Sequence, residues 1–221
     1  MQHKVRVWDL PTRLFHWTLA ATVVALFVTA KVGGNAMQWH LQLGHLMLAL
    51  LAFRLIWGLV GGHWSRFATF AYSPARLWRY LRTAGGDEAV GHSPLGALSV
   101  FALLAVLLAQ VCSGLLSDDE ISFAGPLTRF VSGEWVGLAT WFHSDIGQYL
   151  LMGLVALHLL VIGFYALVRR RNLVRPMLGG DKLLDRPAAN SRDDKASRAG
   201  AALVAALCTV LAWWVFRLGM A

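Results

Sequence analysis

Residues 143–168, HSDIGQYLLMGLVALHLLVIGFYALV, form an apolar run that carries two histidines and a single charged residue. About 20 apolar residues suffice to cross a bilayer, so His143 is expected near one membrane surface and His158 well inside. Their separation of 15 residues corresponds to roughly 22 Å along a helix and to positions within about 60° of one face. One helix is therefore predicted to present two imidazoles at two depths, and ionisable groups within a membrane tend to mark functional sites.

Composition places the whole chain among polytopic membrane proteins. Hydrophobic residues make up 57% of the 221 residues and charged residues 14%, with a mean hydropathy of +0.55, which excludes an ordinary soluble domain and a disordered chain. The formal net charge of +8 does not indicate a nucleic-acid partner, because the basic residues flank apolar runs, as the positive-inside rule predicts. Cys112 and Cys208 lie within apolar runs, which argues against a disulfide framework or a zinc cluster.

Five apolar runs are predicted to be membrane-spanning helices, which makes the chain all-α. They cover about 13–32, 39–60, 93–116, 143–168 and 200–219. Asp9 and Ser93 are typical N-caps, and each precedes a proline that falls in the first turn of its helix. The predicted domains are a four-helix unit at 1–176, a flexible polar linker at 177–199 and an additional C-terminal transmembrane helix at 200–221.

Basic residues predict the orientation of the chain in the membrane. Most of the 20 lysines and arginines lie in residues 1–13, 61–92 and 169–199, which the five spans place on one side. By the positive-inside rule this side is the cytoplasm. The N-terminus is therefore expected in the cytoplasm, and the loop 117–142 and the C-terminus on the outer side.

Four histidines pair by their depth in the membrane. The pairs are His16 with His158 on the cytoplasmic side, and His40 with His143 on the outer side. Two bis-imidazole sites stacked in a helix bundle match the needs of two six-coordinate b haems. Gly44 follows His40 by one helical turn, which leaves room for a porphyrin, and Gly147 follows His143 at the same spacing.

Other histidines compete with this assignment. His45 points about 140° away from His40 on the same helix, so only one of the two can serve a given haem, and the glycine spacing favours His40 without excluding His45. His92 lies at the start of the third span, where a polar contact is the better interpretation. A non-redox use of the histidines, for proton or metal transport, also stays open on spacing alone.

Two arginines could bind haem propionates. Arg54 lies 14 residues after His40 on nearly the same helix face, and the spans hold no acidic residue at its depth. A guanidinium binds a carboxylate through two hydrogen bonds, so a propionate suits Arg54, although snorkelling towards the surface is the alternative. Arg13, three residues before His16, could act in the same way.

Several segments resemble the bacterial cytochrome b561 and nickel–iron hydrogenase b-subunit family. They are RVWDLPTRLFHWTLAATVVALFVTA, HLQLGHLMLALLAFRLIWGLVG, GHSPLGALSVFALL, and GPLTRFVSG followed by HSDIGQYLLMGLVALH. The resemblance covers about residues 5–170 and implies an integral membrane four-helix bundle that holds two b haems. It implies His16, His40, His143 and His158 as the iron ligands, which decides for His40 over His45. The fifth span lies outside the resemblance.

These observations predict a carrier of single electrons across a bacterial inner membrane. The expected partners are a quinone pool or a redox-enzyme subunit and, at the acidic outer loop 117–142, a c-type cytochrome. Quinone is a further candidate cofactor. The alternatives are a quinone- or superoxide-reactive oxidoreductase that works at a haem edge, and a non-redox small transporter or anchor.

Overall fold

The computed structural model describes residues 2–82 and 89–219. Within these residues, five helical stretches are long and apolar enough to cross a membrane. They are α1 (Leu10–Val32), α2 (Ala36–Val60), α4 (Pro94–Leu115), the continuous stretch Gly133–Leu167 and α8 (Lys195–Leu218). The continuous stretch combines α5 (Gly133–Trp141), a π-helical turn η4 (Phe142–Gly147) and α6 (Gln148–Leu167). The predicted all-α fold with five membrane-spanning helices is confirmed.

Local capping explains where three of these helices begin. The Asp9 carboxylate accepts a hydrogen bond from the Thr12 backbone N–H, and the Ser93 hydroxyl accepts one from Gly96. Both helices carry proline in the first turn, where the missing N–H costs little. Both caps were predicted from the sequence. Asp194 caps α8 through the backbone N–H of Ser197.

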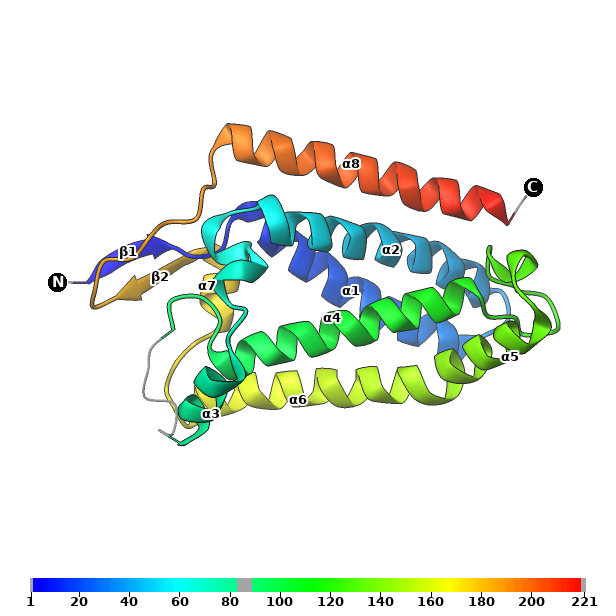
Figure 1. The fold of residues 1–221 in the computed structure, drawn as a ribbon, viewed down its shortest axis with the longest axis horizontal. Coiled ribbons are helices and arrows are strands. Elements are labelled where there is room, and N and C mark those ends of the chain that lie inside the picture. Colours follow the sequence, from blue (N-terminus) through cyan, green and yellow to red (C-terminus); the bar gives the residue numbers. More distant parts are fainter. Residues whose placement is uncertain (1, 83–88, 220–221) are drawn as a thin grey trace.

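The helices pack in a chain of neighbours. α1 packs on α2, α2 on α4, and α4 on α6, while α8 lies along α2. In Figure 1, α8 and α6 lie at opposite edges of the molecule with α2 between them. The fifth helix therefore extends the bundle on the side away from α6.

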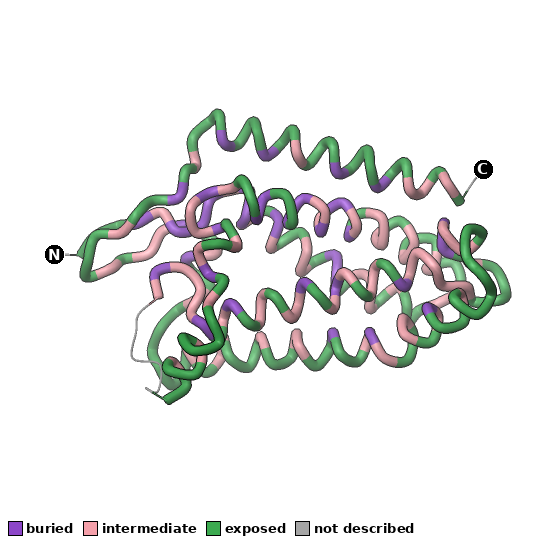
Figure 2. Tube along the Cα trace, in the orientation of Figure 1, coloured by how far each residue is buried: buried purple, intermediate pink, exposed green. Residues whose placement is uncertain are grey.

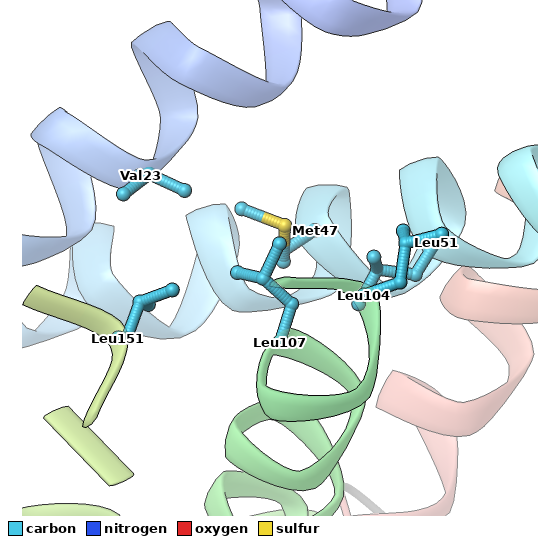
Figure 3. Packing of buried hydrophobic residues seen from close by; sticks show 6 residues of the cluster. All are labelled: Val23, Met47, Leu51, Leu104, Leu107 and Leu151. Atoms are coloured by element: carbon cyan, nitrogen blue, oxygen red, sulfur yellow. The ribbon is translucent and has the colours of Figure 1, made fainter. Parts of the chain in front are cut away.

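Two apolar clusters hold the bundle together. The larger joins α1, α2, α4 and α6 through the six buried side chains drawn in Figure 3: Val23, Met47, Leu51, Leu104, Leu107 and Leu151. The second attaches α8 and contains Phe15, Phe53, Trp57, Ala201 and Cys208. The outward faces of α6 and α8 remain exposed (Figure 2), as expected where lipid rather than protein is the neighbour.

One end of the bundle, called the sheet end below, is covered by short elements. β1 (His3–Arg6) pairs antiparallel with β2 (Asp181–Leu184). The surface helices α3 (Pro74–Arg82) and α7 (Val174–Gly179) and the 3-10 turns η1 (His63–Ser65) and η2 (Phe67–Thr69) lie at this end too. The other end, called the loop end, holds the connection from α4 to α5 with the turn η3 (Thr128–Phe130).

The segment 177–199, expected to be a flexible linker, is folded onto the N-terminus. The Arg6 guanidinium bonds Asp181 at 2.6 Å and Asp193 at 2.7 Å. The Ser191 side chain donates to the Val7 carbonyl at 2.7 Å and is buried. Its polar composition resembles that of a linker, but its carboxylates and hydroxyls find partners in the first residues of the chain.

Candidate functional site

The four predicted ligand histidines lie on four different elements. His16 is on α1, His40 on α2, His143 in the π-helical turn η4 and His158 on α6. His40 and His143 meet near the loop end. Their ring centroids are 6.1 Å apart and their planes are nearly perpendicular, at 87°. The structure thus brings together the two residues that the sequence paired on the outer side.

Each ring of this pair is oriented by the backbone of a neighbouring helix. The His40 Nδ1 lies 3.1 Å from the Leu26 carbonyl oxygen, and the His143 Nδ1 lies 2.8 Å from that of Gln110. A carbonyl can only accept, so both Nδ1 atoms carry the proton and donate it. The lone pair of each imidazole is then on Nε2, the atom available to a metal.

The spacing of the rings fits one metal ion between them. Two metal–nitrogen bonds of about 2 Å each, plus the distance from each nitrogen to its ring centre, sum to about 6 Å. The observed separation of 6.1 Å matches this. The pair can therefore supply the two axial nitrogens of a six-coordinate haem iron.

Two residues of α4 hold His143, and neither was predicted from the sequence. The Gln110 side chain donates to the His143 carbonyl at 2.9 Å, and a side chain on Gly114 would contact the imidazole at 2.8 Å. His143 lies in a π-helical turn, a distortion often found at functional sites. Gln110 is an isolated amide within an apolar span, which was a signal available in the sequence.

A cavity of about 370 Å³ surrounds this pair and extends towards the loop end. Gly44 lines the cavity, and a Cβ added there would meet open space. Gly147 is different, because a Cβ there would run into the Gln110 side chain. The two glycines of the repeated His-x-x-x-Gly spacing therefore have different structural roles. Gly44 leaves space beside His40, whereas Gly147 lets α4 approach the π-helical turn.

His16, near the start of α1, and His158, on α6, are the second predicted pair. They lie within electrostatic range of each other. The buried Nδ1 of His16 has no hydrogen-bond partner among the described residues. α1 packs mainly on α2, and α6 packs mainly on α4. His16 and His158 therefore lie on two helices that pack mainly on other helices and not on each other. A buried nitrogen without a partner is costly, and metal ligation would satisfy it.

The two candidate propionate-binding arginines have protein partners. A guanidinium nitrogen of Arg13 donates to the Leu178 carbonyl, while its Nε is buried without a partner in the described part of the chain. Arg54 is 4% exposed; it donates to the Ser65 carbonyl at 3.2 Å and its guanidinium lies over the Phe67 ring. The negative charge of Asp9, just outside the spans, acts favourably on the Arg54 guanidinium.

The competing histidines have different environments. The His45 ring contacts Phe216 of α8, with centroids 4.5 Å apart. His92 lies between Trp8 and Phe70. Burial, and then the charges of Arg54, Lys182 and His16, lower the pKa of His92 to about 3, so its imidazole is neutral at physiological pH.

Comparison with known proteins identifies the family. The family model for prokaryotic cytochrome b561 matches residues 7–180. This chain belongs to the prokaryotic cytochrome b561 family. The match runs from the residues before α1 to α7 and ends before α8, so the predicted resemblance is confirmed. As a b561-family protein, the chain is a multi-pass membrane b-type cytochrome, and the family implies haem b and electron transport.

The curated relatives of this cytochrome share one description. A "Probable Ni/Fe-hydrogenase B-type cytochrome subunit" of Azotobacter chroococcum mcd 1 is 27% identical over 223 residues, covering 84% of this chain and 92% of the relative. The protein of the same description from Rhizobium leguminosarum bv. viciae is 22% identical, with 82% and 90% coverage. No solved structure matches. The relatives are subunits named for a redox enzyme.

Proposed function

We propose that this cytochrome carries single electrons across the bacterial inner membrane through two b haems, one ligated by His16 and His158 and the other by His40 and His143. The observation that carries this proposal is the facing pair His40 and His143, with both Nδ1 protons donated to carbonyls. Two half-buried rings 6.1 Å apart, each with its tautomer fixed by a backbone carbonyl, favour binding of one iron over a transport role.

The residues around the sites have definite tasks in this proposal. When bound, the haems supply one-electron redox chemistry. The carbonyls of Leu26 and Gln110 fix the tautomer of the outer histidines and raise the basicity of Nε2. Leu151 of the apolar cluster in Figure 3 falls between His143 and His158 along the same helical stretch, so this cluster would separate the two haems. Arg13 and Arg54 place positive charge near the inner pair, which favours the reduced iron.

The orientation and the partners are part of the same proposal. The basic residues of the sheet end support a cytoplasmic position for this end and the N-terminus, and a periplasmic position for the C-terminus. The names of the relatives support a redox-enzyme subunit as one partner. A quinone pool is the other source or sink of electrons that a membrane carrier can reach.

Optical spectroscopy of the purified protein tests the proposal. A reduced-minus-oxidised spectrum with pyridine haemochrome quantitation should show two low-spin b haems per chain, because two bis-imidazole pairs are present. A single haem would mean that one of the pairs is wrongly assigned. Protein that is folded and free of haem after expression with ample haem supply would contradict the electron-carrier proposal.

The acidic turn at the loop end is the proposed docking site for a basic c-type cytochrome. Asp119 is exposed and accepts backbone hydrogen bonds from Ile121, Ser122 and Phe123. These hydrogen bonds, Phe123 first, lower the pKa of Asp119, so its charge persists at physiological pH. Opposite charges on two partners accelerate their encounter.

Reversing the charges of this turn tests the docking proposal. Asp118→Lys with Asp119→Lys should slow electron exchange with a basic c-type cytochrome, most strongly at low salt. Asp185→Lys, at an exposed position just beyond β2 at the sheet end, is the control for the same kind of charge change on the opposite side of the molecule. Stopped-flow rates that keep their value and their salt dependence in the double variant would place docking elsewhere.

A further inference from the structure

A buried carboxylate lies at the sheet end, just before the first membrane span. Asp9 is 0% exposed. Its Oδ1 accepts from the Thr12 backbone N–H at 2.8 Å and from the Trp57 indole N–H at 3.2 Å. Its Oδ2 accepts from the Ser65 hydroxyl at 2.6 Å. Residues from the start of α1, the end of α2 and η1 therefore converge on this one side chain.

These contacts are those of an ionised carboxylate. All three partners donate, and an ionised carboxylate only accepts. The Thr12 hydroxyl lies 2.7 Å from the Ser65 hydroxyl; because Ser65 donates to Asp9, Thr12 donates to Ser65. The two hydroxyls thus form a chain of donors that ends on Asp9 and stabilises its negative charge.

Ser65 joins this carboxylate to the buried arginine. Its hydroxyl donates to Asp9, and its carbonyl accepts from Arg54 at 3.2 Å. The negative charge of Asp9 acts favourably on Arg54. Burying an arginine is costly unless it has a counter-charge. Asp9 supplies that charge from the protein, so Arg54 is balanced without a propionate.

The bridged pair lies beside the inner histidines. Asp9 precedes His16 by seven residues, which is about 10 Å along the helix and within about 20° of the same face. His92 lies within electrostatic range of both Arg54 and His16, which places Arg54 close to the same pair. No comparable buried carboxylate and arginine occur around His40 and His143 among the described residues.

We propose that Asp9 and Arg54, joined through Ser65, form a bridged ion pair that sets the reduction potential of the haem ligated by His16. The inference rests on the proposed function, since it needs a haem at the inner pair. Arg54 favours the reduced iron, and Asp9 offsets that effect. Asp9 is thus a tuning residue that touches neither the iron ligands nor, on the contacts described, any bound group.

The test is a redox titration of the purified holoprotein and three variants. Asn caps helices as well as Asp does, so Asp9→Asn removes the charge and retains the start of α1. At about 10 Å and an effective dielectric constant of about 20, one charge should change the reduction equilibrium roughly tenfold; for one electron this is about 59 mV.

The inner haem should become easier to reduce in Asp9→Asn and harder to reduce in Arg54→Gln. The double variant should return close to the parent value, because both charges are gone.

Two internal references separate this inference from the proposed function. The outer haem should keep its potential in every variant, and His16→Ala identifies which of the two transitions is the inner one. Asp194→Asn removes another capping aspartate, at the start of α8; Asp194 is exposed to solvent, so its charge is screened and its loss should shift neither haem.

The outcomes are distinct. Two bound haems with an unshifted inner potential in Asp9→Asn would overturn the ion-pair proposal and leave the electron carrier intact. If Asp9→Asn does not fold, Arg54→Gln still tests the proposal: a harder-to-reduce inner haem supports Arg54 as the positive member of the pair, and an unchanged one overturns the pair. Parent protein without haem would instead contradict the proposed function.

Discussion

Replacing His40 or His143 by alanine is expected to reduce the haem content from two b haems per chain to one. The two imidazoles face each other at 6.1 Å, so removal of either leaves an iron with one axial ligand and a cavity open to the loop end. Pyridine haemochrome quantitation measures the loss, and the redox titration should retain only the inner transition. Because the α2 and α4 contacts of the core cluster do not involve these rings, the variants should still fold.

His45→Ala is the matched control for this experiment. His45 lies on the same helix, five residues after His40, and also lines the cavity. Its ring packs on Phe216 of α8, so its loss should loosen the contact between α2 and α8 while both haems stay bound. If the His45→Ala variant binds one haem and the His40→Ala variant binds two, then His45, and not His40, is the iron ligand on α2.

Gly44→Leu should exclude the outer haem without unfolding the protein. A Cβ added at Gly44 meets no neighbouring atom within 4 Å, and Gly44 lines the cavity that His40 and His143 also line. Leucine therefore fits the bundle but takes the space that a porphyrin needs beside its ligand, and it is a strong helix former where glycine costs about 1 kcal/mol. The expected result is loss of most of the outer haem, measured by haemochrome content, with an unchanged or raised melting temperature.

Gly200→Leu provides the control for the same change of residue. Gly200 lies on α8, is exposed, and also has open space where its Cβ would be. Leucine there should leave both haems in place. Full haem content in Gly44→Leu would mean that the porphyrin does not lie along this face of α2, and the position of the haem relative to His40 would have to be revised.

The sequence by itself determined the membrane fold and the pairing of the outer histidines. Runs of about 20 apolar residues can only be helices in a bilayer, and the caps at Asp9 and Ser93 mark where two of them begin. The depth of a residue in a spanning helix follows directly from its position in the run. For this reason His40 and His143 could be matched before their rings were placed together.

Only the tertiary structure decided how the histidines are held. In the π-helical turn, the His143 carbonyl accepts a hydrogen bond from Gln110 of another helix, and no local pattern around His143 predicts such a turn. The segment 177–199 reads as a linker, but Ser191 and Asp193 bind the N-terminus. Such contacts join residues more than 180 positions apart, and no local pattern encodes which distant donor meets which acceptor.

Arg54 is a further example of a residue whose need for an anion was predicted from the sequence but whose partner depends on the fold. Its place in an apolar span predicted the need for an anion, since a buried guanidinium requires one. That Asp9 is a candidate for this anion became apparent only from the way α1, α2 and η1 meet, because Ser65 bonds both Asp9 and Arg54. A hydrophobic run is a local feature that can be recognised in the sequence. The hydrogen-bond partner of a buried polar group is usually distant in the sequence, so it is known only from the folded structure.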